Sequence, residues 1–179
     1  MSGGGDVVTP GFQSVYAALV PFIIGVTGLA AANVVQGLPN RAAMPLPGFV
    51  TIQGITRKRL ATNVQTWDQV SNPPMSLAIE QDIELGIQID CYGPISADWA
   101  DMLTTLLRDE YGVNALAPNV TPLYADDARM IPLVDGEEQY EERWSIDAHF
   151  QYNPVTTVPQ QYANVLDITL INVQEAYPQ

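Results

Sequence analysis

The chain has 179 residues, of which seven are basic and twenty are acidic, and its formal net charge is −13 at pH 7. This balance argues against a protein that grips nucleic acid, because affinity for the phosphate backbone comes from Lys and Arg. The single cysteine, Cys91, excludes an internal disulfide and indicates a chain made in a reducing cytoplasm, or an assembly built in one.

The charge is unevenly distributed along the chain. Residues 1–67 contain four basic residues and one acidic residue, a net charge of +3. Residues 68–179 contain three basic and nineteen acidic residues, a net charge of −16. The acidity either keeps the protein soluble or provides a surface that DNA passes without sticking, and composition alone does not decide between the two.

Residues 1–10 predict a flexible N-terminal arm, and residues 11–179 predict a single domain without repeats or an internal linker. Residues 11–35 contain no charged side chain, which is also a feature of membrane spans. Pro21 and two glycines interrupt this stretch, and it has neither the basic flank of a span nor the basic start of a signal peptide. We therefore predict a helix over 11–24 that is buried against a sheet, followed by a turn and a short apolar segment.

The next part of the chain predicts two strands. Residues 37–48 are too rich in proline and glycine for a helix or a central strand, and predict a connector. GFVTIQGI (48–55) predicts a short strand from its β-branched content. The basic cluster at 57–59 follows, and the alternation over 60–70 predicts a second, more polar strand at an edge or an interface.

The stretch from Ile79 to Tyr111 is the predicted structural centre. Apolar and polar residues alternate over 83–92, which predicts a strand with one buried and one exposed face. Gly93 and Pro94 end this strand, and Ser96 is the predicted N-cap of an amphipathic helix that ends at Gly112. The apolar stripe of the helix consists of Trp99, Met102, Leu103, Leu106 and Leu107.

Three prolines forbid long elements in the segment that follows, in which 124–129 predicts a single helical turn or a loop. An acidic run at 135–142 surrounds a turn. Strict alternation over 143–153 predicts another strand, and a loop with two prolines leads to the last predicted strand at 162–177.

The candidate chemistry is sparse. His149, the only histidine, falls on the polar face of its predicted strand, whereas Cys91 falls on an apolar face, where a buried and inert thiol is expected. The acidic pairs at 126–127, 137–138 and 141–142 lack the spacing of a calcium loop, and a solvated face explains them better than a metal site. No glycine-rich phosphate loop is present. We predict no enzyme, with no catalytic residue, metal or cofactor.

Five stretches of the chain carry a resemblance to a known family. They are VVQGLPNRAAMPLPGFVTI (34–52), RLATN (59–63), IELGIQIDCYGPISADWADMLTTLLRDEY (83–111), PLYADDARMIPL (122–133) and YEERWSIDAHFQYNP (140–154). In this order they resemble the phage neck terminator, or tail-terminator-like, proteins of tailed bacteriophages. The family usually carries a second proline in the stretch occupied here by residues 41–44, so this turn departs from its pattern.

The resemblance implies an α+β fold in which an antiparallel sheet packs with an N-terminal helix and a central amphipathic helix. It implies a homohexameric ring at the neck of the virion, assembled in the host cytoplasm, that caps the tail tube, ends its polymerisation and joins the tail to the head connector. DNA would pass through the lumen without specific binding. The implied partners are further copies of the chain, the tail tube protein, with the sheath as a further candidate, and the connector or stopper protein; no membrane is implied.

Two alternatives stay open at this point. The first is a head-completion stopper or adaptor in the same neck, and the second, from another class, is a metal-dependent enzyme that uses the acids at 126–142. Tails of uncontrolled length in the absence of the protein would indicate a terminator, whereas normal tails that fail to join heads would indicate a stopper.

Opposite charges predict where the chain contacts its partners. If identical copies lie side by side, the basic cluster of one can face the acidic run of the next, a heterologous contact of the type that closes a ring. Pairing within one chain, or simple exposure, explains the same residues equally well. The predicted contact residues are Arg57, Lys58, Arg59, Trp67, Glu137, Glu138, Glu141, Glu142 and Arg143. Trp99, Leu103 and Leu107 are assigned to the core.

Overall fold

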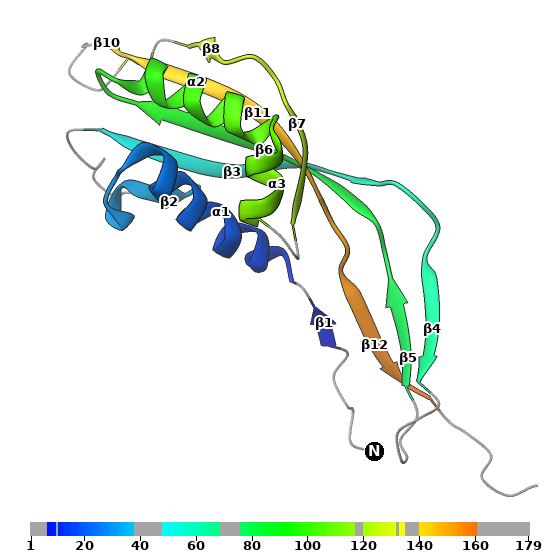
Figure 1. Cartoon of the computed structure of the whole chain (residues 1–179). Coiled ribbons are helices and arrows are strands. Elements are labelled where there is room, and N and C mark those ends of the chain that lie inside the picture. Colours follow the sequence, from blue (N-terminus) through cyan, green and yellow to red (C-terminus); the bar gives the residue numbers. More distant parts are fainter. Residues whose placement is uncertain are drawn as a thin grey trace, which may run out of the picture.

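The computed structural model describes residues 7–9, 11–37, 48–68, 76–116, 120–131, 133–134 and 140–160. Within these ranges the fold is α+β, with mainly antiparallel sheets and three α-helices, as predicted (Figure 1). A large sheet and its helices form a body, and a smaller sheet projects from one end of it (Figure 1).

The large sheet is built around the predicted central strand. Its order is β2 (Val34–Gln36), β3 (Phe49–Arg59), β6 (Ile83–Tyr92), β11 (Arg143–Tyr152) and β7 (Thr121–Ala125), with β8 (Arg129–Met130) also paired to β11. Strand β6 pairs antiparallel with β3 on one side and β11 on the other, so that Ile89 lies opposite both Ile52 and Ile146. Strand β2 runs parallel to β3. The predicted strands at 83–92 and 143–153 are confirmed.

The helices pack on the apolar face of this sheet. They are α1 (Phe12–Thr27), α2 (Ser96–Leu107) and α3 (Glu110–Leu116), and a 3₁₀ turn, η1 (Ala31–Asn33), follows α1. Leu19 of α1 and Leu103 of α2 belong to the same buried cluster as Ile87 of β6 and Phe150 of β11. All four side chains are fully buried. The predicted core residues Trp99 and Leu107 belong to this cluster too.

Helix α1 is longer than predicted. It passes through Pro21, whose side chain is exposed, and continues to Thr27, whose hydroxyl donates to the carbonyl of Ile23. Gly28 then ends the helix in the left-handed conformation (φ 71°), and its N–H donates to the carbonyl of Ile24. The missing N–H of Pro21 costs one hydrogen bond, but burial of the apolar side chains on either side of it keeps the helix continuous.

The central helix also differs from the prediction at both ends. Ile95 occupies the N-cap position and makes no side-chain cap, while Ser96 is the first helical residue. The helix ends at Leu107, and Gly112 lies inside α3 instead of terminating α2. A Cβ on Gly112 would lie 2.5 Å from the carbonyl oxygen of Leu106, so this glycine lets α3 pack tightly against the end of α2.

The smaller sheet, which we call the arm sheet, continues three strands of the body. Its order is β1 (Val7–Thr9), β12 (Val155–Pro159), β5 (Ser76–Glu80) and β4 (Val64–Asp68). Strand β3 leads into β4, β5 into β6, and β11 into β12, with short breaks between them (Figure 1). The prediction of a loop at Pro154 and Pro159 is wrong, because the four β-branched residues between them form β12 and the prolines fall at its ends.

Other predicted elements change in extent or cannot be compared. Strand β3 is eleven residues long and includes the basic cluster, whereas the second strand shortens to β4, which is an edge strand. At 124–129 no helical turn forms, and residues 126–128 form a loop between β7 and β8, the other predicted alternative. A two-stranded sheet pairs β9 (Leu133–Val134) with β10 (Tyr140–Glu141). The connector at 38–47, residues 135–139 and the predicted strand at 162–177 lie outside the described residues.

Among the described residues, no helix is both long and apolar enough to cross a lipid bilayer.

Candidate interaction surfaces

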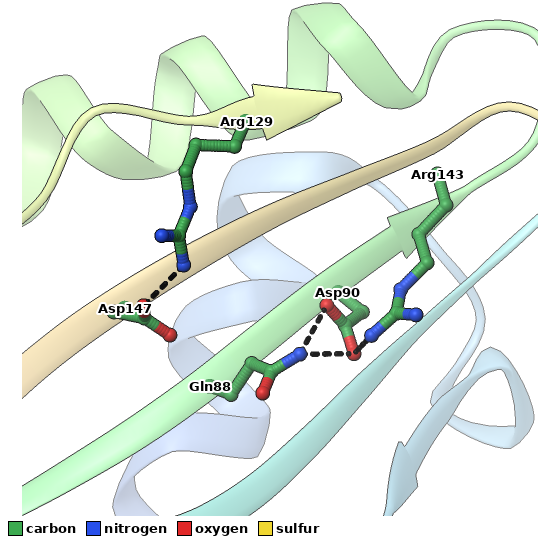
Figure 2. A network of polar contacts seen from close by, with 5 residues as sticks. All are labelled: Gln88, Asp90, Arg129, Arg143 and Asp147. Carbon is green, nitrogen blue, oxygen red and sulfur yellow. Dashed lines mark hydrogen bonds and ion pairs between the residues drawn. The ribbon is translucent and has the colours of Figure 1, made fainter. Parts of the chain in front are cut away.

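The face of the large sheet opposite the helices carries polar side chains from its central strands. Alternation places Gln88 and Asp90 of β6 on this face, together with Arg143 and Asp147 of β11. The register sets Arg143 opposite Tyr92, and Asp147 opposite Gln88. Figure 2 shows how these side chains meet across the strands. We call this surface the polar face.

Asp90 is the centre of the network on the polar face. Arg143 Nη2 donates to Asp90 Oδ2 at 2.8 Å, and Gln88 Nε2 lies 3.0 and 3.1 Å from the two carboxylate oxygens (Figure 2). The Asp90 side chain is 7% exposed and that of Arg143 is 21% exposed. Burial would lower the pKa of Arg143, but the hydrogen bond and the charge of Asp90 outweigh it and raise that pKa above its usual value.

A second group of polar contacts surrounds Glu84. His149 Nδ1 lies 2.9 Å from Glu84 Oε1, and Lys58 Nζ lies 4.0 Å from Glu84 Oε2. The ring of Tyr124 stacks on His149 with a centroid distance of 4.2 Å. His149 therefore lies on the polar face of its strand, as predicted, and its ring is fixed there by the carboxylate and by the aromatic neighbour.

The charges on the polar face cancel. Its three cations pair with three carboxylates: Lys58 with Glu84, Arg129 with Asp147, and Arg143 with Asp90. The face therefore adds no net charge, and the acidity of the chain lies elsewhere. Exposed carboxylates of the described residues lie on the helices and around β7 and β11: Asp98, Asp101, Asp109, Glu110, Asp126, Asp127 and Glu142.

Four of the predicted contact residues lie at opposite ends of the large sheet. Arg57, Lys58 and Arg59 lie on the outer end of β3, and all three are exposed. Arg59 lies opposite Ile83 at one end of β6, and Arg143 lies opposite Tyr92 at the other. At ~3.3 Å per residue the two ends are about 30 Å apart.

The remaining predicted contact residues differ in what the structure describes. Trp67 on β4 is 51% exposed. Glu142 is exposed, and its carboxylate accepts a hydrogen bond of 2.8 Å from the indole N–H of Trp144. Glu141 is described only by its backbone in β10, and Glu137 and Glu138 lie outside the described residues. Arg143 makes its ion pair within the chain, whereas Trp144 packs against the core from the opposite side of β11.

A pocket of about 360 Å³ opens where the arm sheet joins the body. Arg57 lines it together with Phe12 and Tyr152, and the guanidinium lies 5.8 Å from the centroid of each ring. Sequence reasoning missed this junction because its members come from α1, β3 and β11, which are far apart in the chain. No spacing signal joins them.

The buried thiol leads to a direct chemical test. Cys91 is fully buried, and burial, helped by the charge of Asp90, raises the pKa of its thiol from 9.0 to about 12. A rise of this size lowers the thiolate fraction at pH 8 about 1,000-fold. We expect a colourimetric disulfide reagent to leave the native protein unmodified at pH 8 and to titrate one thiol in urea. Fast reaction of the native chain would contradict this packing.

The polar clusters form no metal centre in the described part of the chain, where no group of three or more His, Cys, Asp or Glu side chains converges. A comparison with curated proteins found no match. A comparison with protein families matches residues 13–176 to the family described as phage neck terminator protein. Because this match covers nearly the whole chain, the protein belongs to the phage neck terminator family and has a structural role at the neck of the virion.

Proposed function

We propose that identical copies of this chain form a ring that caps the tail tube, ends its polymerisation and joins the tail to the head connector. Membership of the phage neck terminator family supports a neck position. The observation that carries the ring is the separation of about 30 Å between the basic end of β3 and the acidic end of β11. Two patches of opposite charge at that distance are too far apart to pair with each other within one chain, but they can pair between neighbours.

The contact between copies is heterologous in this proposal. The basic cluster Arg57–Arg59 of one copy faces the acidic run at 135–142 of the next, and repetition of the same contact closes a ring when the rotation between copies is a simple fraction of a turn. Glu142, the member of that run with a described side chain, is exposed. Six copies is the number implied by the resemblance to tail terminators.

The remaining partners follow from the position of the ring. One side of it contacts the end of the tail tube, and the other contacts the connector or stopper protein of the head. DNA passes through the lumen without specific binding, because a chain of net charge −13 repels the phosphate backbone. Such a ring requires no metal or cofactor.

The mass of the purified protein in solution tests the ring. Six copies of a 19.5 kDa chain have a mass of about 117 kDa, and we expect light scattering to measure this value at low salt. Added salt should shift the mass toward that of single chains, because salt screens the attraction between exposed patches of opposite charge. A single chain at every concentration, together with no protein bound to the ends of isolated tail tubes, would refute the ring.

Tail length separates the cap from the alternative role. Phage that lack the protein should make tail tubes of uncontrolled length, because nothing ends their growth. Tails of normal length that fail to join heads would instead show a stopper or adaptor, and the capping role would then be wrong.

A further inference from the structure

The segment from Ile55 to Trp67, which we call the arm strip, is exposed at every one of its residues. It contains three basic residues and no acidic residue, so the rest of the chain carries a net charge of −16. It also exposes four large apolar side chains, each by more than 40%: Ile55, Leu60, Val64 and Trp67. A long exposed stretch that is both basic and apolar is typical of a protein-binding surface.

The strip is exposed because the helical layer ends where it begins. The N–H of Gly54 donates to the hydroxyl of Tyr16 in α1, and a Cβ on Gly54 would lie 2.8 Å from the ring of Phe12, the first residue of that helix. The register of β3 shifts at the next residue, Ile55, which forms a bulge. A bulge bends and twists its strand, so β3 passes beyond the helical layer here. It stays paired with β6 as far as Arg59 and then continues toward β4, the outer strand of the arm sheet (Figure 1).

A complementary surface lies on α2 and α3. The exposed acidic side chains of this surface are Asp98 and Asp101 on α2, Asp109 between the helices and Glu110 on α3. Its exposed large apolar side chains are Met102, Tyr111 and Val113. A shallow pocket of about 320 Å³ opens on α2 between Asp101 and Leu106. This helical surface is therefore complementary to the arm strip. Its negative charge is opposite to the charge of the strip, and both surfaces expose apolar side chains.

The two surfaces belong to different parts of the molecule. Helix α2 lies on the body, whereas the arm strip leads away from the body into the arm sheet (Figure 1). Strand β4 pairs with β5 on one side, and its other edge is the end of the arm sheet. The strip and the helical surface can be brought together by a second copy.

We propose that the arm strip of one copy packs over the α2–α3 surface of the next copy. This inference rests on the proposed ring, but it assigns the basic cluster of the strip to the acids of the helical surface instead of the acidic run at 135–142. Charge complementarity identifies the occupant, because the strip carries +3 and the remainder of each copy carries −16. DNA is the poorer occupant, because phosphates would leave Val64 and Trp67 in contact with water, and the acidic body beside the strip would repel them.

Cross-linking between two single-site variants tests the contact directly. One variant carries Val64→Cys on the strip and the other carries Met102→Cys on α2, while the native Cys91 is buried and does not compete. After mixing and mild oxidation, we expect a covalent dimer that contains one copy of each variant. The matched control pairs Val64→Cys with Met130→Cys, since Met130 is at least as exposed as Met102 but lies on β8. The control should give at least tenfold less dimer.

Charge reversal tests the electrostatic part. A chain with Arg57→Glu, Lys58→Glu and Arg59→Glu should remain single where the parent chain assembles, with an unchanged circular dichroism spectrum. Mixing it with a chain that carries the reverse changes on the helical surface should restore assembly. Those changes are Asp101→Lys, Asp109→Lys and Glu110→Lys.

The outcomes separate this inference from the ring itself. Rings that persist in the reversed strip variant, or cross-linking no stronger than in the control pair, would overturn the inference and leave the ring standing. Absence of assembly by the parent chain, in solution and on tube ends, with no cross-linking would overturn both. Binding of a short DNA duplex by the parent chain that is lost in the reversed variant would make the strip a DNA contact, and would also overturn the inference.

Discussion

Replacing Leu103 with alanine should lower the free energy of unfolding by about 3–5 kcal/mol. Leu103 is fully buried in α2 and belongs to the cluster that joins the helices to the large sheet. Removal of its side chain leaves a cavity between the helices and the large sheet. The backbone hydrogen bonds within each layer keep it rigid, so the layers close only partly around the cavity. Urea unfolding followed by circular dichroism measures the loss, as a lower midpoint with an unchanged slope.

The neighbouring residue provides a matched control for this prediction. Met102 lies on the same helix but is 40% exposed, so Met102→Ala should change the free energy of unfolding by no more than about 0.5 kcal/mol. Equal losses for the two variants would mean that α2 packs on the sheet with a different face. If the α2–α3 surface receives the arm strip, Met102→Ala should weaken assembly while leaving the stability of the single chain intact.

The contrast between these two residues shows how far periodicity predicts a helix. A 3.6-residue pattern placed Met102 and Leu103 on one apolar stripe, and the helix itself is confirmed. The assignment of Trp99, Leu103 and Leu107 to the core is confirmed. The pattern did not predict the exposure of Met102, which depends on where α1 and the strands lie around the helix.

The strands were predicted best where one face is apolar along the whole length. β6 and β11 fulfil this condition, and their alternation gave both the extent and the buried face. β12 lacks it, because the arm sheet has no helical layer and its side chains are only partly buried. Two prolines therefore outweighed four β-branched residues in the prediction, although pairing with β1 and β5 decides the structure of this segment.

The interaction surfaces were predictable in charge but not in pairing. Three consecutive basic residues at 57–59 predict an exposed positive patch, because charged side chains are seldom buried. By contrast, Arg143 and Asp90 are 53 residues apart, and only the register of β11 on β6 brings them together. A residue predicted as a partner contact is thus engaged inside its own chain, and its removal has a different expected consequence.

Replacing Arg143 with methionine should destabilise the chain by about 3–5 kcal/mol, because it leaves the carboxylate of Asp90 buried without its cation. Gln88 would still donate to that carboxylate, but an amide cannot neutralise a charge. Adding Asp90→Asn removes the charge and keeps an acceptor for Gln88. The double variant should therefore recover most of the loss in urea unfolding.

The matched control lies on the same face, where Arg129 pairs with Asp147 (Figure 2). The side chain of Arg129 is 61% exposed, so water compensates Asp147 when the arginine is replaced, and Arg129→Met should cost no more than about 1 kcal/mol. Equal losses for the two arginine variants, or a double variant as unstable as Arg143→Met, would show that the Asp90 carboxylate is solvated. A large loss confined to Arg143 would instead show that this side chain neutralises a buried carboxylate between β6 and β11. Its role would then be to hold the sheet that carries the contact surfaces, while the exposed arm strip makes the contact itself.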